Sequence, residues 1–146
     1  MYSNIVFAWV LAAITVAMHG VGLAFMLRIL ARRENIPLRQ LWAISRRLVW
    51  VACYLILLHV IAISTWAAFY VWQGCFPDLE TAFYFSGVTY ATIGYGDVVL
   101  VKPWRLFGLI EGLTGILMCG LSTGVFFAVV NYIHQMVHTK SDDHMP

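Results

Sequence analysis

The chain has 146 residues, of which 62% are hydrophobic and only 11% are charged, and its mean hydropathy is +0.81. Soluble domains carry about 25% charged residues, so this composition excludes a globular protein with a water-exposed surface. The net charge of +2 is too small to indicate nucleic acid as a partner. Membrane lipids are the expected surroundings.

Three stretches are long and apolar enough to cross a bilayer. Residues 1–27 and 48–77 contain no Asp, Glu, Lys or Arg, and residues 106–139 contain only Glu111. Each exceeds the ~20 residues that a transmembrane helix needs. A fourth uncharged stretch, residues 81–96, is shorter and richer in Thr and Gly. These stretches predict an all-α membrane protein with three transmembrane helices and one re-entrant segment.

Basic residues indicate the orientation of these helices. The link between the second and third stretches carries only Lys102 and Arg105, whereas six arginines lie in or beside the link between the first two: Arg28, Arg32, Arg33, Arg39, Arg46 and Arg47. Because cytoplasmic links are enriched in basic residues, we expect an outer N-terminus and a cytoplasmic C-terminus in the plasma membrane. A cleaved signal peptide is the disfavoured alternative for residues 1–27, since no positive region precedes the long apolar run.

The segment 37–47 of the basic link has two interpretations. Its apolar residues tend to one helical face: Leu38, Leu41, Trp42 and Ile44. Such a segment lies in the headgroup layer as an interfacial helix, or it forms a solvated linker. The sequence favours neither.

The most specific sequence motif lies at the end of the re-entrant segment: Thr89-Tyr90-Ala91-Thr92-Ile93-Gly94-Tyr95-Gly96-Asp97. It resembles the selectivity-filter signature of potassium channels, T-x-x-T-x-G-Y-G-D, and matches every specified position. The resemblance implies K⁺ binding at Thr92, Ile93, Gly94 and Tyr95, with Gly96 completing the filter. Since one chain supplies one of the four strands that such a filter needs, it also implies a homotetramer.

Elementary chemistry explains why these residue types suit a filter. A pore that passes a dehydrated cation replaces its water shell with backbone carbonyl oxygens. Gly94 and Gly96 can adopt the positive φ angles that such a backbone requires. We expect Ile93 and Tyr95 to pack outward against the preceding helix and Thr92 to add a hydroxyl at the inner end.

Filter support is expected from Asp97, Tyr84, Thr89 and Glu111. In the potassium channel family, the counterpart of Asp97 is tied by an aromatic donor and an acid, which align with Tyr84 and Val88, so the acid is missing here. Glu111 is an ionisable group inside a span, which marks it as functional. We expect a protonated Glu111 to hydrogen-bond to Ser86, Thr89 or Tyr90, and a proton-sensitive gate is the alternative.

The third span resembles the pore-lining inner helix of the same family. Gly115 and Gly120 match its hinge glycine and a second packing glycine. Glycines in a helix interior indicate either bending or close helix packing, and both remain open for Gly115. The expected gating and pore-lining residues are Gly115, Ile116, Cys119, Gly120, Thr123 and Phe127, with Phe127 as a hydrophobic constriction.

The resulting expectation is a K⁺-selective channel that conducts passively. Its segments are an N-terminal transmembrane helix (1–30), a basic linker (31–47), and a pore module (48–138) with outer helix 48–72, pore helix 78–91, filter 92–97 and inner helix 104–136, followed by a tail (139–146). A nonselective cation channel and a non-conducting auxiliary subunit are the alternatives. Common enzyme motifs are absent from the sequence, so we expect no catalytic residues, no cofactor, K⁺ as the permeant ligand and no obligatory protein partner.

Overall fold

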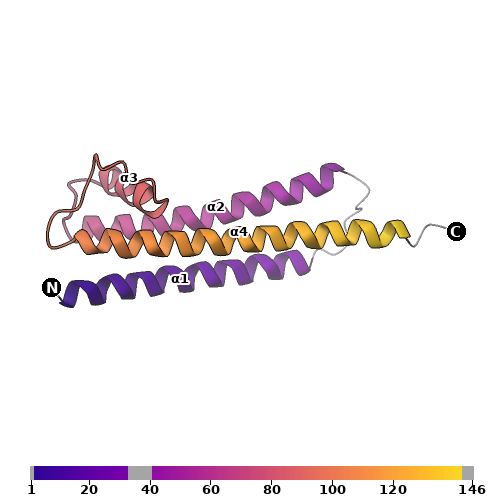
Figure 1. Cartoon of the computed structure of the whole chain (residues 1–146), viewed down its shortest axis with the longest axis horizontal. Helices are drawn as coiled ribbons and strands as arrows, with labels where there is room; N and C mark the ends of the chain where they lie inside the picture. The colour runs from indigo at the N-terminus through magenta and orange to yellow at the C-terminus, as the bar shows by residue number, and fades with distance from the viewer. Residues whose placement is uncertain (1, 33–40, 143–146) are drawn as a thin grey trace.

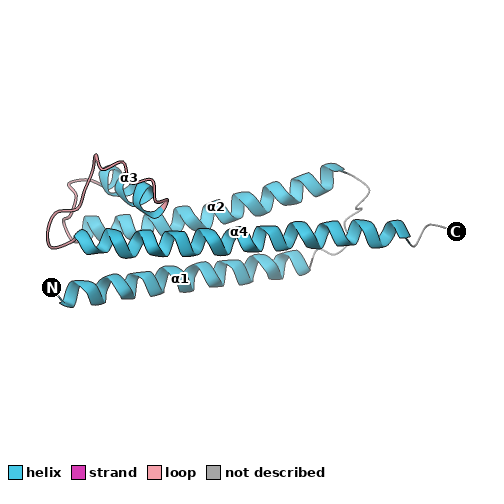
Figure 2. Ribbon diagram, in the orientation of Figure 1, coloured by secondary structure: helices cyan, strands magenta, loops and turns pink. Residues whose placement is uncertain are grey.

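The computed structural model describes residues 2–32 and 41–142, which form four α-helices (Figures 1 and 2). They are α1 (Tyr2–Ala31), α2 (Leu41–Trp72), α3 (Leu79–Tyr90) and α4 (Arg105–Asp142). Three helical stretches are long and apolar enough to cross a membrane: Ile5–Ala31, Leu41–Trp72 and Arg105–Gln135. The predicted all-α membrane architecture is confirmed.

The three long helices run alongside one another, and the short α3 lies at one end of the bundle (Figure 1). α3 contacts α2 and α4, whereas α1 contacts α2 and α4. The start of α1 lies at the same end of the bundle as α3, and the end of α4 lies at the opposite end (Figure 1). This relative topology agrees with the prediction. Which end faces the exterior stays a prediction.

α2 begins at Leu41, inside the stretch assigned to the linker. Residues 41–47 are therefore helical, because no glycine or proline interrupts the sequence up to Trp72. The remaining residues of the expected interfacial segment, 37–40, lie outside the described residues, as do Arg33 and Arg39. Arg47 Nη2 donates to the carbonyl oxygen of Leu30 at 3.0 Å, which joins the start of α2 to the end of α1. α4 likewise continues to Asp142, past the expected end at 136.

Two apolar clusters hold the bundle together. The cluster near α3 joins α1 to α2, α3 and α4 through Ala8, Leu11, Ala12, Trp66, Tyr70, Phe85 and Phe107. The cluster toward the other end contains Leu23, Met26, Val51, Leu55, Leu58, Val129 and Ile133. Since lipid is as apolar as these side chains, their contribution comes from close packing rather than from exclusion of water. α1 therefore belongs to the packed bundle along its length.

Three glycines of α4 lie where α3 approaches: Gly108, Gly112 and Gly115. A Cβ at Gly115 would collide with the backbone carbonyl of Tyr90, and one at Gly112 would lie 3.5 Å from the carbonyl oxygen of Thr89. α4 runs without interruption past Gly115. Of the two interpretations of Gly115, close packing is the one that this conformation shows. A Cβ at Gly120 would meet no atom within 4 Å in the single chain.

Gly115→Ala tests this packing. The added methyl must push α3 away from α4, so we expect the free energy of unfolding in detergent micelles to fall by about 1–3 kcal/mol. Gly20→Ala is the matched control, because a Cβ at Gly20 meets nothing within 4 Å and alanine favours the helix by up to about 1 kcal/mol. Equal stability of the two variants would contradict the close approach at Gly115.

Candidate functional site

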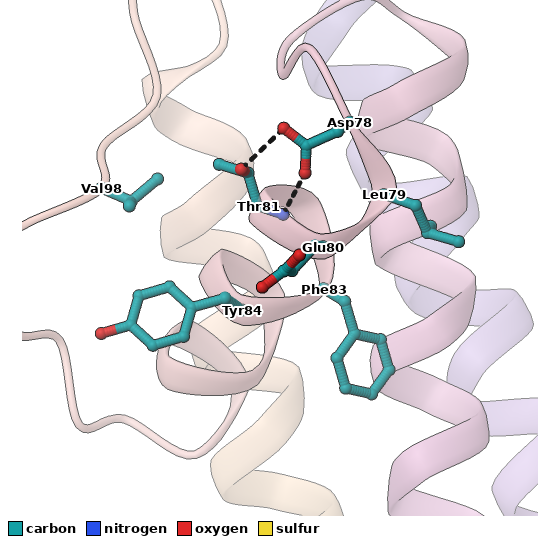
Figure 3. Close-up of a pocket in the computed structure, with 7 residues that line it drawn as sticks. All are labelled: Asp78, Leu79, Glu80, Thr81, Phe83, Tyr84 and Val98. Atoms are coloured by element: carbon teal, nitrogen blue, oxygen red, sulfur yellow. Dashed lines mark hydrogen bonds between the residues drawn. The ribbon is translucent and has the colours of Figure 1, made fainter.

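The site begins at the N-terminus of α3, where Asp78 caps the helix. Its side chain accepts hydrogen bonds from the backbone N–H of Thr81 at 2.7 Å and from the Thr81 hydroxyl at 2.9 Å (Figure 3). The backbone hydrogen bond from Thr81 lowers the pKa of Asp78 below its ordinary value, because it favours the ionised carboxylate. Glu80 adds a second acid in the first turn. Both acids suit the positive end of the helix dipole.

The chain leaves α3 through a sharp turn held by the carbonyl groups of Val88 and Thr89. The amides of Ile93 and Gly94 both donate to the carbonyl oxygen of Val88, at 2.8 and 3.1 Å, and the amide of Thr92 donates to the carbonyl of Thr89 at 3.0 Å. Three bonds thus attach the start of the expected filter to the last turn of α3. The sequence did not indicate this role of Val88, because it uses only the backbone.

The backbone after this turn alternates in handedness. φ is positive at Thr92 (59°), Gly94 (56°) and Gly96 (79°) and not at Ile93 or Tyr95. Such alternation turns successive peptide planes so that their carbonyl oxygens line one side, as a row of cation ligands requires. The positive φ at both glycines was predicted. The one at Thr92 was missed, because only glycine adopts this conformation without cost.

The side chains of the filter strand have few neighbours in the single chain. Ile93 is 53% exposed and Tyr95 is 69% exposed. The expected packing of these two side chains against the preceding helix stays a prediction: more than half of each is uncovered, although Tyr95 lies close enough to Tyr84 of α3 to act on it electrostatically. A row of carbonyl groups with exposed side chains behind it needs further protein around it at membrane depth.

Asp97 is tied to α3 by Tyr84. The Tyr84 hydroxyl donates to Asp97 Oδ2 at 2.7 Å, and Asp97 Oδ1 accepts from the amide of Val98 at 3.0 Å. The Tyr84 hydrogen bond lowers the pKa of Asp97, and the same bond raises the pKa of Tyr84. The contact expected between these residues is present. The position of the missing acid, Val88, is buried.

Glu111 is fully buried behind α3. Tyr70 OH donates to Glu111 Oε2 at 2.7 Å, and Ser86 Oγ lies 2.5 Å from Glu111 Oε1. Ser86 is thus confirmed as a partner, whereas the structure shows no hydrogen bond from Glu111 to Thr89 or Tyr90 among the described residues. Tyr70 was not predicted, because the facing sides of α2 and α4 cannot be read from either helix alone.

The hydrogen-bond count around Glu111 indicates its protonation state. Ser86 Oγ also lies 3.0 Å from the carbonyl oxygen of Ile63, which can only accept. Since a serine hydroxyl has one proton, all contacts are satisfied together when Ser86 donates to Ile63 and a protonated Glu111 donates to Ser86. Tyr70 then donates to the other oxygen of Glu111. This neutral network joins α2, α3 and α4.

The expected pore-lining residues of α4 divide between two faces. Ile116 (58%) and Phe127 (63%) are exposed, as are Cys119, Gly120 and Thr123. Gly115 is buried against α3 and does not share their face. Between α4 and the filter strand lies a groove whose lining includes Thr89, Thr92, Gly94, Gly112 and Ile116. The exposed face of α4 thus continues from the inner end of the filter strand.

Comparisons with known proteins agree with this geometry. A family model described as "Ion channel" matches residues 55–132, more than half of the chain. The chain belongs to the ion channel family. It is also similar to the voltage-gated potassium channel Kch of Escherichia coli (strain K12), with 43% identity over 68 residues, which is 43% of this chain and 16% of Kch. The chain thus spans a small part of the length of that relative. No solved structure matches.

Glu111→Gln and Glu111→Ala test the proton count. A glutamine amide donates to Ser86 and its carbonyl accepts from Tyr70, so we expect its free energy of unfolding to lie within about 0.5 kcal/mol of the parent value. Glu111→Ala leaves two buried hydroxyls with lost partners beside a cavity, and we expect a loss of about 2–4 kcal/mol. Unfolding in detergent micelles measures both. An equal loss in the glutamine variant would indicate an ionised Glu111.

Tyr84→Phe tests the link to Asp97. We expect the pKa of Asp97 to rise toward its ordinary value of 3.8 in this variant. Because the pKa of Asp97 in the folded protein lies below that value, the contact stabilises the loop above the ordinary pKa and is lost as the pH falls through the lowered one. Titration of the carboxyl carbon by NMR measures the shift. Tyr132→Phe, at an exposed tyrosine of α4, should leave the pKa of Asp97 unchanged.

Proposed function

We propose that this ion channel is selective for K⁺ and conducts it passively through a homotetrameric pore. The observation that carries the proposal is the alternating backbone of residues 92–96, whose positive φ angles fall at Thr92, Gly94 and Gly96 within a complete T-x-x-T-x-G-Y-G-D sequence. The carbonyl groups of Thr92, Ile93, Gly94 and Tyr95 bind successive K⁺ ions in place of water. The similarity to Kch, a voltage-gated potassium channel, supports the same ion.

A homotetramer would complete the ring of carbonyl groups of which one chain supplies a single strand. One strand of carbonyl groups cannot surround an ion, and four copies about one axis can. The exposed side chains of Ile93 and Tyr95 then pack against neighbouring subunits. This burial also meets the requirement that irregular backbone at membrane depth be enclosed by protein.

The helix dipole of α3 assists the cation. Asp78 and Glu80 lie at its N-terminus, so its C-terminus, with partial negative charge, lies at the inner end of the filter. A K⁺ ion in the cavity below the filter is stabilised there. The exposed face of α4, with Ile116, Thr123 and Phe127, lines that cavity toward the cytoplasm. In this proposal the end of the bundle with α3 faces the exterior of the plasma membrane.

The proposal is tested by the reversal potential of the purified protein in a planar bilayer with K⁺ on one side and Na⁺ on the other. We expect a value close to the K⁺ equilibrium potential. Current that reverses near zero would instead indicate a nonselective cation channel. Absence of current from a folded tetramer would indicate an auxiliary subunit.

Gly96→Ala tests the filter assignment in the same bilayer. A Cβ at the positive φ of 79° costs about 1–2 kcal/mol per strand, and 1.4 kcal/mol corresponds to a factor of ten. We therefore expect the K⁺ over Na⁺ permeability ratio to fall by about tenfold or more. Gly74→Ala is the matched control, because Gly74 has a φ of 67° and lies outside the filter. Unchanged selectivity in Gly96→Ala would contradict the assignment.

A further inference from the structure

α1 lies outside the residues that match the ion channel family, 55–132, yet it carries a buried histidine. His19 is 1% exposed, and its Nε2 lies 2.9 Å from Ser122 Oγ on α4. Its ring lies 4.9 Å from the ring of His59 on α2, centroid to centroid. Two imidazoles from different helices thus meet at the junction of α1, α2 and α4. Packing alone does not require ionisable groups there.

The histidine pair is connected to the base of the filter. His59 Nδ1 lies 3.3 Å from the hydroxyl of Tyr90, the last residue of α3. The carbonyl of Tyr90 is the group that Gly115 of α4 accommodates, and Thr92 begins the alternating backbone two peptide bonds later. Protonation of the histidine pair therefore affects α3, α4 and the filter through Tyr90.

The surroundings of the pair are largely apolar and leave a buried ring nitrogen without a partner among the described residues. Tyr90 packs with Ala62 and Met118 in a small apolar cluster, against which Met18 and Ile63 also lie. His19 Nδ1 is buried and has no hydrogen-bond partner among the described residues. The titratable groups that face the pair are Tyr90 on α3 and, beyond it, Cys119 and Glu111 on α4, which both act electrostatically on Tyr90.

We propose that His19 and His59 form a proton-binding pair through which α1 regulates the pore, so that proton uptake lowers the K⁺ current. Two cationic rings 4.9 Å apart repel each other strongly in an apolar environment, so the pair takes up a single proton. This inference rests on the proposed K⁺ conduction, because the current is what the proton changes.

The direction of the effect follows from the helix dipole of α3. A proton on His59 places a positive charge beside Tyr90, at the negative end of that dipole, and a proton on His19 places the charge one ring further away. The same partial charge stabilises K⁺ below the filter in the proposed pore, so the imidazolium and K⁺ compete for it. In the tautomer whose Nδ1 accepts from the Tyr90 hydroxyl, protonation of His59 turns Nδ1 into a donor and so changes this contact.

The first experiment records K⁺ current in planar bilayers between pH 7.5 and 4.0, a range wide enough to include a histidine whose charged form is disfavoured by burial. We expect the current of the parent protein to fall by about threefold or more across this range, with K⁺ selectivity measured at pH 7.5 beforehand. His19→Gln and His59→Gln should each reduce that response to less than about half. His134→Gln, at an exposed position of α4, is the matched control and should keep it. K⁺-selective current with equal pH responses in all four proteins would overturn the inference and leave the proposed function intact.

The second experiment does not depend on conduction. The ¹⁵N signals of labelled histidines in lipid nanodiscs report proton uptake directly, and assignment uses the same two variants. We expect one proton to bind to the pair between pH 7.5 and 4.0. Tyr90→Phe should retain this uptake, while the pH response of its current becomes smaller, because only the electrostatic part of the coupling remains. If neither ring takes up a proton, the inference is wrong. If the pair titrates in a protein without K⁺-selective current, the coupling to the pore is overturned together with the proposed function.

Discussion

An unsatisfied backbone group at membrane depth costs several kcal/mol, and this constraint shapes the region in which α3 ends. The chain must leave the helix in the interior of the bundle and still pair its amides. It does so by directing the amides of Ile93 and Gly94 to the single carbonyl of Val88. The close approach of α4 at Gly115 encloses the adjacent carbonyl of Tyr90. The geometry of the filter strand thus depends on how the last turn of α3 is packed.

The sequence was sufficient for the parts of the fold that depend on local pattern. Charge-free length predicted the three membrane helices, and the pore helix expected at 78–91 corresponds to α3 (Leu79–Tyr90). The predicted start of α2 at residue 48 was wrong. The arginines at positions 46 and 47 mark where the apolar span begins, and the helix itself begins earlier, at Leu41. A helix continues into polar surroundings until a residue such as proline or glycine stops it.

The site was predictable only where a residue's role follows from its own conformation. Gly94 and Gly96 required positive φ, and the structure has it. The partners of Glu111 depend on how α2 is rotated about its axis, so Tyr70 was missed while Ser86, on the neighbouring α3, was found. The contact of His19 with Ser122 joins residues that are far apart in the sequence, and no pattern within either helix indicates it.

The neutral network around Glu111 also bears on how the chain enters the membrane during synthesis. A lone carboxyl resists transfer of a new span into lipid, and α4 emerges from the ribosome after α2 and α3. By then α2 and α3 have been made, so the hydroxyls of Tyr70 and Ser86 are available before Glu111 arrives. The order of the helices along the chain therefore supplies the partners ahead of the group that needs them.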